Sequence, residues 1–424
     1  MGQVIREVSR QLRPEAQELL CALIRLPSTA GSPTQAQELV ARELGWLGLE
    51  TERFIIDPKE VADHPEYTPP QAGGGENLYA AWPGQKRGRS LLIFSHIDTE
   101  PLTHPEQWHH PPFQPTTQGD RLYGLGSADA KAGVAAMLMA IRVLRQAGLY
   151  PAGEVRILSI LGKQGGALGT LGAMVRGYRA DASIYLHPAE SGAGWSQIKT
   201  ASRGMLNFEI MVRGVVPPER EIGTPESALS YHGTSALDKA WHLVSALKEQ
   251  DEQWAQEQED DPDWGRPLFL NVGSVHGGDH PGRVPAECRL QGRVVFRPPH
   301  TLPDMERELR SIVESVVARD PYFLEHPPQL SFFGVRANPV QLPADHPLLR
   351  TAKQHVRDVS GITPQDYGLH SASDIRFPML YADSPTIGLG PGGGGFHGPN
   401  EWVSLDDYYH SIEFLARMIM DWCG

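Results

Sequence analysis

The sequence predicts an α/β fold, in which a mixed, mostly parallel sheet is flanked by helices and interrupted by an inserted α+β ferredoxin-like domain. Three observations support this prediction. At 424 residues the chain is long for one hydrophobic core, so two domains are expected. Short apolar runs alternate with helical stretches in the first half of the chain, which is typical of a parallel sheet. From about Gly204 the order becomes strand, helix, two strands, helix and strand, which indicates a separate unit.

The elements of the first domain follow from hydrophobic periodicity. Apolar residues at helical spacing indicate helices, and short continuous apolar runs indicate buried strands. We expect this domain in residues 1–203 and 325–424. Its expected elements are helices at 14–26, 34–48, about 131–147 and about 406–421, and strands at 90–94 and 155–161.

The inserted domain is expected in residues 204–324, although its pattern continues to a strand just beyond. Two stretches between its elements, 217–231 and 249–263, are rich in proline or charge and are predicted to be surface loops. The expected elements are strands at 207–213, 269–277, 287–297 and 329–335, and helices at 235–249 and 302–318.

Composition excludes several classes of function. A net charge of −13 argues against a nucleic-acid or anionic-membrane surface, since both need clustered Lys and Arg. Residues 1–26 contain no uninterrupted apolar core, so we expect neither a secretory signal nor a transmembrane span, and a cytoplasmic location. Cys21, Cys288 and Cys423 are too scattered for a disulfide framework or a Cys-rich zinc site. We therefore expect a small-molecule substrate, with no nucleic acid or membrane as partner.

Three segments carry residues that can bind a metal. His96 and Asp98 follow an apolar strand, at the end of the strand where open α/β sheets place ligands. Thirty-three residues after His96, a glycine turn delivers Asp129 just before a helix. His397 lies in a loop near the C-terminus. Each signal is weak alone, but together they indicate a metal centre.

With these segments, the chain strongly resembles the zinc aminoacylase, succinyl-diaminopimelate desuccinylase and carboxypeptidase G family of metallopeptidases. The resemblance covers nearly the whole chain in the correct order. It is carried by Leu26-Pro27-Ser28, Ser95-His96-Ile97-Asp98, Trp108 with Pro112-Phe113, Asp129-Ala130-Lys131, Ser373-Asp374 and Gly390-Pro391-Gly392 with His397.

The resemblance implies a zinc-peptidase-like α/β catalytic domain with an inserted lid, which in this family also forms homodimers. It further implies that His96 and Asp129 are metal ligands, that Asp129 bridges two metals, and that His397 completes the second site. Asp98 would support the centre. The peptide after the bridging aspartate is often cis in this family, so a cis Asp129-Ala130 bond is expected.

The chain departs from the family at the metal centre. The general-base glutamate and its neighbouring ligand glutamate align with Lys163 and Gln164, and a further acidic ligand aligns with His187. Together with Asp129, these residues carry no net charge where the family offers four carboxylates. Repulsion between an ammonium and a dication about 4 Å apart is roughly 8 kcal/mol at an effective dielectric of about 20. A dinuclear site is therefore not expected.

A single metal remains chemically sensible. His96, Asp129 and His187 form a two-histidine, one-carboxylate set that zinc accepts with a fourth position open. The second site retains Asp129, Gln164 and His397, and an amide is a poor ligand. We therefore expect one zinc or none. The alternative for His187 is a packed histidine that fills the space of a lost carboxylate.

Lys163 admits several interpretations. Beside zinc it could lose its proton and act as a general base. If it stays charged and pairs with Asp129, it could bind an anionic intermediate or a substrate carboxylate. A desolvated lysine could also form a Schiff base with a carbonyl substrate. The remaining alternative is a structural ion pair in an inactive site.

Our leading hypothesis is an enzyme that hydrolyses, or transfers the acyl group of, an amide bond in a small acyl-amino-acid or peptide-like substrate. It would use an atypical mononuclear zinc site, with Lys163, Asp98 and Gln164 as the catalytic residues. One alternative is a ligand-binding pseudoenzyme without catalysis. The other is a metal-free, lysine-centred enzyme with condensation or lyase chemistry.

Overall fold

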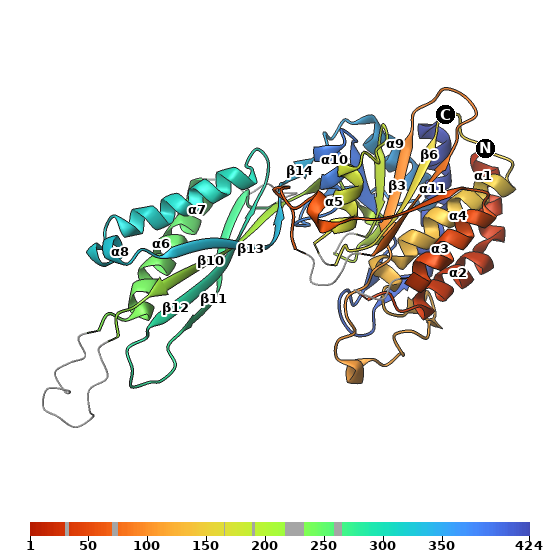
Figure 1. The fold of residues 1–424 in the computed structure, drawn as a ribbon. Coiled ribbons are helices and arrows are strands. Elements are labelled where there is room, and N and C mark those ends of the chain that lie inside the picture. The colour runs from red at the N-terminus through yellow and green to blue at the C-terminus, as the bar shows by residue number, and fades with distance from the viewer. Residues whose placement is uncertain (30–33, 70–74, 165, 189–190, 217–232, 258–264) are drawn as a thin grey trace, which may run out of the picture. The chain divides into compact units, whose positions relative to one another are not determined.

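The computed structural model describes residues 1–29, 34–69, 75–164, 166–188, 191–216, 233–257 and 265–424. The chain divides into two compact units (Figure 1). The larger contains Met1–Ser202 and Val340–Gly424, and the smaller contains Arg203–Pro339. The chain thus re-enters the larger unit at Val340 and not at residue 325 as expected, because the strand at 329–337 pairs within the small sheet.

The larger unit contains an eight-stranded mixed sheet in the order β1-β2-β6-β3-β7-β16-β8-β15. The four central strands β6, β3, β7 and β16 are parallel to one another, and β8 is parallel to β15, which confirms the predicted mostly parallel sheet. Antiparallel pairs occur at β1/β2, β2/β6 and β16/β8. The strands are β1 Thr51–Ile55, β2 Glu76–Trp82, β3 Leu91–His96, β6 Val155–Ile160, β7 Ser183–Leu186, β8 Gln197–Lys199, β15 Gln365–Tyr367 and β16 Thr386–Leu389.

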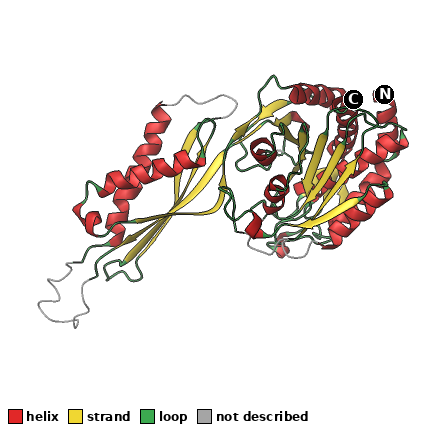
Figure 2. Ribbon diagram, turned by 45° about the horizontal axis from the view of Figure 1, so that its top comes forward, coloured by secondary structure: helices red, strands yellow, loops and turns green. Residues whose placement is uncertain are grey.

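Helices cover both faces of this sheet, as Figure 2 shows. Successive side chains of a strand point to opposite faces, so Leu91 and Ile93 of β3 enter one core while Leu92 and Phe94 enter the other. Burial on both faces explains the continuous apolar runs of the sequence. The first core is covered by α1 Gly2–Gln11, α2 Arg13–Arg25, α3 Thr34–Trp46, α4 Ala132–Gln146, α9 Pro347–Ser360 and α11 Leu405–Trp422, and the second by α5 Leu168–Val175 and α10 Arg376–Tyr381.

A small four-stranded sheet, ordered β17-β18-β5-β4, joins two distant parts of the larger unit. Its pairing of β18 with β5 sets the loop that carries His397 beside the turn that carries Asp129. Its strands are β4 Thr116–Gln118, β5 Arg121–Tyr123, β17 Gly393–Gly394 and β18 Trp402–Ser404, and a separate pair is formed by β9 Ala201–Ser202 and β14 Val340–Gln341.

The smaller unit is a four-stranded antiparallel sheet in the order β11-β12-β10-β13, with its main helices packed on one face. The order of strands and helices along the chain is that of a ferredoxin-like fold, as predicted. Its elements are β10 Gly204–Arg213, α6 Ala236–Glu257, β11 Leu268–Gly277, β12 Glu287–Phe296, α7 Leu302–Val317, α8 Pro321–Glu325 and β13 Gln329–Ala337.

One expected loop of the smaller unit is wrong in part. Helix α6 continues to Glu257, eight residues beyond the expected end, because Trp254 packs in the unit's core and anchors the last turns. The acidic stretch from residue 249 is therefore helical at first, and residues 258–263 lie outside the described residues. The other expected loop, 217–231, also lies outside them.

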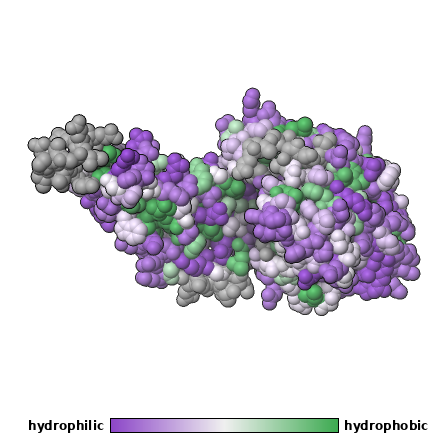
Figure 3. Space-filling model, turned by 90° about the horizontal axis from the view of Figure 1, so that it is seen from below, coloured by the Kyte–Doolittle hydropathy of each residue, from purple (hydrophilic) through white to green (hydrophobic). Residues whose placement is uncertain are grey.

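The surface is mostly polar. On the face of the larger unit in Figure 3, hydrophilic residues predominate and hydrophobic ones form small scattered spots. No helix within the described ranges combines the length and the apolar character needed to cross a lipid bilayer.

Candidate metal centre

Three of the predicted ligands meet at the edge of the large sheet. His96 ends β3, and His187 directly follows β7, which lies parallel beside β3. Asp129 lies in the turn that precedes α4. The ligand atoms of these three buried side chains lie within 4.8 Å of one another. The ends of parallel strands share one edge of a sheet, so the fold brings His96 and His187 together although 91 positions separate them in the sequence.

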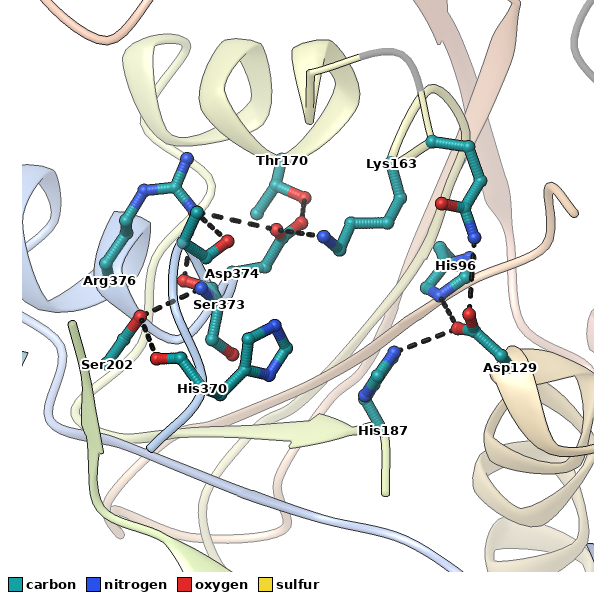
Figure 4. Close-up of polar contacts among 12 residues, drawn as sticks. His96, Asp129, Lys163, Thr170, His187, Ser202, His370, Ser373, Asp374 and Arg376 are labelled. Carbon is teal, nitrogen blue, oxygen red and sulfur yellow. Dashed lines mark hydrogen bonds and ion pairs between the residues drawn. The ribbon is translucent and has the colours of Figure 1, made fainter. Parts of the chain in front are cut away.

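The two carboxylate oxygens of Asp129 contact different partners. Oδ1 lies 2.9 Å from Nε2 of His96 and 2.8 Å from Nε2 of His187 (Figure 4). Oδ2 lies 2.7 Å from Nε2 of His397 and 3.3 Å from the amide nitrogen of Gln164. The peptide bond between Asp129 and Ala130 is cis, as the resemblance implied. Asp129 is thus central to all the expected ligands.

The electrostatics of the cluster favour an ionised Asp129. Burial alone would raise the pKa of this carboxyl, but His187, His397 and His96 outweigh burial and hold the pKa well below its usual range. Burial likewise opposes a charge on His96, but Asp129 and Asp98 raise the pKa of its imidazole to about 10. The hydrogen bond to Asp129 raises the pKa of His397.

The donor set fits zinc. Two imidazole nitrogens and one carboxylate oxygen are a ligand combination that zinc accepts, and here they converge in a buried place. The ionised carboxylate of Asp129 places negative charge where the imidazole nitrogens converge, and a cation bound there would share that charge. His96, Asp129 and His187 could therefore hold one zinc ion.

Backbone carbonyls orient both imidazoles. Nδ1 of His96 lies 3.0 Å from the carbonyl oxygen of Asp98, and Nδ1 of His187 lies 2.8 Å from that of Pro188. A bound cation would displace the proton of Nε2, and a proton kept on Nδ1 and donated to the carbonyl would fix the tautomer that presents the Nε2 lone pair to the metal. The fully buried Lys199 also places Nζ 2.8 Å from Nδ1 of His187. No sequence signal singled out Lys199, which lies in a short strand run.

Lys163 does not take the expected place beside Asp129. Its Nζ lies 3.5 Å from Oδ1 of Asp374, and Figure 4 shows the side chain directed to that carboxylate. Asp374 is fully buried and accepts a 2.5 Å hydrogen bond from Oγ1 of Thr170. Burial opposes ionisation of Asp374, but the charges of Lys163 and Arg376 lower its pKa. Lys163 and Asp374 therefore form an ion pair beside the cluster.

Gln164 and Asp98 link the cluster to the Lys163 turn. The backbone N–H of Gln164 donates to Oδ2 of Asp98 at 2.9 Å, and its side-chain amide reaches Asp129. Oδ1 of Asp98 is buried, lies 3.6 Å from Nδ1 of His96, and has no hydrogen-bond partner within the described residues. Of the three residues that we predicted to be catalytic, Gln164 contacts Asp129 and Asp98 contacts His96, whereas Lys163 pairs with Asp374.

Sequence reasoning missed Glu100, which lies two residues after Asp98. This partly buried carboxyl interacts electrostatically with His397, Asp129, Asp98 and Lys163. Burial raises its pKa, with further increases from the negative charges of Asp129 and Asp98. The signal was an extra acidic residue next to the His-x-Asp motif, which no family pattern marked.

The model of peptidase family M20/M25/M40 matches residues 92–421. An N-formyl-4-amino-5-aminomethyl-2-methylpyrimidine deformylase of Halalkalibacterium halodurans is 26% identical over 441 residues, covering 99% of this chain and 98% of the relative. A succinyl-diaminopimelate desuccinylase of Alkalilimnicola ehrlichii is 26% identical over 417 residues, covering 95% and 97%.

Solved structures share the fold over both units. A tripeptidase of Staphylococcus aureus has a TM-score of 0.74 at 17% identity, covering 97% of this chain and 98% of that one. An M20 family metallo-carboxypeptidase of Sulfolobus solfataricus has a TM-score of 0.71 at 16% identity, covering 96% and 99%. At these identities the likeness establishes the fold, so the chemistry has to be argued from the residues of the site.

Proposed function

The chain belongs to peptidase family M20/M25/M40, and from this premise we propose that it hydrolyses an amide bond of a small acylated or peptide-like substrate at a single zinc ion. The family membership confirms the resemblance inferred from the motifs, and the named relatives are hydrolytic enzymes. The observation that supports the single-zinc centre most strongly is the convergence of His96, Asp129 and His187 within 4.8 Å.

The ligands are prepared for this role by their surroundings. His96 and His187 are held by carbonyl oxygens at Nδ1, so each presents Nε2 to the centre. Asp129 is held as the anion by the neighbouring imidazoles. When bound, zinc would supply an activated water and would polarise the scissile carbonyl.

Lys163 acts as a fixed positive charge in this proposal. Its contact with the buried carboxylate of Asp374 engages Nζ away from Asp129, which supports an electrostatic role and argues against a role as general base. An ammonium in a partly enclosed site stabilises negative charge that develops on a substrate oxygen. Lys163 thus contributes electrostatic stabilisation at the position where the family pattern has a glutamate.

Glu100 is the candidate proton acceptor. It is a partly buried carboxylate whose charge interacts with His397 and Asp129, and burial raises its pKa, which makes it a better proton acceptor than an exposed glutamate. Asp98 would keep His96 oriented, and Gln164 would hold the second oxygen of Asp129. The proton of the attacking water would pass to Glu100 and then to the leaving amine.

We also propose that a second cation is not bound. Within the described residues, His96, Asp129 and His187 are the one group of three such side chains that come this close. The other oxygen of Asp129 faces a half-exposed His397 and an amide, which offers little negative charge to a dication.

The remaining proposals concern the setting of the enzyme. The smaller unit would serve as a lid or dimerisation domain, as the family resemblance implies, and the protein would act in the cytoplasm. Light scattering after size-exclusion chromatography measures the oligomeric state. A monomer at micromolar concentration would contradict the dimer.

Metal analysis joined to a turnover assay tests the function. The protein is purified, its zinc content is measured, and N-formyl, N-acetyl and N-succinyl amines and amino acids are tested with di- and tripeptides. We expect one zinc per chain and turnover that is lost on chelation and restored by zinc. Activity in metal-free protein would refute the zinc mechanism, and borohydride trapping of a substrate on Lys163 would support the lysine-centred alternative. Zinc binding without turnover of any compound would favour the pseudoenzyme.

A further inference from the structure

Glu401 is a buried carboxylate bonded to the turn that carries Asp129. It is 2% exposed. Its Oε2 accepts a hydrogen bond from the backbone N–H of Gly126 at 2.7 Å, and its Oε1 accepts from those of Ala128 and Asp129 at 2.9 and 3.0 Å. Three backbone donors of one turn therefore converge on a single side chain.

The turn needs such an acceptor. Asp129 and Ala130 have non-helical backbone angles, and the regular helix α4 begins only at Ala132. Backbone N–H groups ahead of a helix have no partner within it, and leaving them unpaired in a buried place is costly. A carboxylate forms strong hydrogen bonds with such donors.

The same segment is bonded to a second loop. Asn400, the neighbour of Glu401, accepts a 2.7 Å hydrogen bond from the backbone N–H of His109 and donates one of 2.9 Å to the carbonyl of Gln107. The carbonyl of Glu401 accepts a further bond from Gly124. The loop that begins with His397 is thus joined to both the 107–109 loop and the Asp129 turn.

We propose that Glu401 is a positioning residue, which holds the Asp129 turn against the His397 loop so that both side chains meet in one geometry. Glu401 acts through the backbone of residues 126–129, from which its carboxylate accepts hydrogen bonds. The effect that loss of Glu401 would have on zinc affinity rests on the proposed function. The consequence for the turn itself does not.

The test is the variant Glu401→Gln, which keeps the shape but replaces one acceptor oxygen with a donor. We expect backbone amides of residues 126–129 to exchange hydrogen for deuterium about tenfold faster in the metal-free protein, since a charge-assisted bond is lost. Zinc affinity should fall by about 10- to 100-fold, as for other residues that orient ligands. Where turnover is measurable, kcat should fall more than KM rises.

Glu413→Gln is the matched control. Glu413 is also a buried carboxylate of the larger unit, but it is bonded to Arg6 and Arg417, away from the site. This variant should lower thermal stability without changing exchange at 126–129 or zinc affinity. An equal effect of both variants on exchange at 126–129 would show a general loss of stability and would overturn the proposal.

The outcomes separate this inference from the proposed function. Unchanged exchange at 126–129 in Glu401→Gln overturns the positioning role, whatever the activity. If Glu401→Gln does not fold, Glu401→Asp decides, because it retains the charge but shortens the reach. Faster exchange at 126–129 in that variant supports the role, and wild-type exchange overturns it. Faster exchange in a protein whose wild type binds no zinc would leave the positioning role intact and would refute the zinc centre.

Discussion

The two oxygens of Asp129 face two different environments. On the Oδ1 side lie His96 and His187, whose side chains are 1% and 7% exposed. On the Oδ2 side lie His397, 58% exposed, and the amide of Gln164. The first side has the burial and ligand types of a closed metal site, whereas the second has a single imidazole open to solvent.

This difference teaches that losing carboxylates at one side need not dismantle the other. By the family resemblance, His187 stands where an acidic ligand is expected, and its imidazole nitrogen faces Oδ1 of Asp129. Lys163 brings a positive charge that pairs with the buried Asp374, and under the proposed function this pairing offsets part of the repulsion between Lys163 and a cation held by His96. The site is thereby divided into a cation side and an ammonium side.

The largest expected effect compares a histidine from each side. His187→Ala should lower zinc affinity by more than about 100-fold and abolish turnover, because it removes one of three ligands. His397→Ala should lower zinc affinity by less than about tenfold. Zinc competition with a chromophoric chelator measures both. Equal losses of zinc affinity in the two variants would mean that the Oδ1 and Oδ2 sides bind metal equally well, which would contradict the proposed difference between them.

The second prediction concerns the ammonium side. Lys163→Met should lower kcat by about 100-fold with unchanged zinc content, because a charge that stabilises the transition state is lost. The matched control is Lys353→Met, which removes a lysine paired with Asp366 at 2.7 Å on the surface of α9. Steady-state kinetics of both variants provide the measurement. Loss of zinc in Lys163→Met would show that this lysine supports the cation side instead.

The third prediction converts the ammonium side toward the family pattern. In Lys163→Glu combined with Gln164→Glu, the Oδ2 side gains two carboxylates beside His397. We expect the zinc content to rise from one to two per chain, measured by elemental analysis after gel filtration. The single variant Gln164→Glu serves as control and should gain less. A content of one zinc in the double variant would mean that backbone geometry, more than charge, excludes the second ion.

The smallest effect is a pH dependence at Asp374. Its pKa is depressed in the folded state, so its contribution to the free energy of unfolding is present above the unfolded value of about 4 and is lost as pH falls through the folded pKa. In Asp374→Asn the free energy of unfolding should fall less steeply as the pH is lowered. At pH 7 it should be smaller than in the wild type by about 1–3 kcal/mol. Urea unfolding between pH 2 and 7 measures it. An unchanged acid slope would show that Asp374 is not held as the anion by Lys163.

Local pattern was sufficient for much of the fold. Continuous apolar runs identified β3 and β6 because both strands are buried on two faces, and helical spacing identified α2, α4 and α11. Helix α1 was not expected, because its apolar face is narrow and only Ile5 and Ser9 are buried. The short strand β7, which positions His187, gave too few residues for a period to be read.

The sequence by itself determined the α/β fold with its inserted ferredoxin-like unit, and it determined His96, Asp129, His187 and His397 as the residues that meet. Strand ends and helix starts follow from local periodicity, and ligand types follow from residue identity. Only the tertiary structure decided that Lys163 pairs with Asp374 and that Glu401 holds the Asp129 turn. These partners lie more than 200 residues apart in the chain, so packing of the whole unit, and no local pattern, selects them.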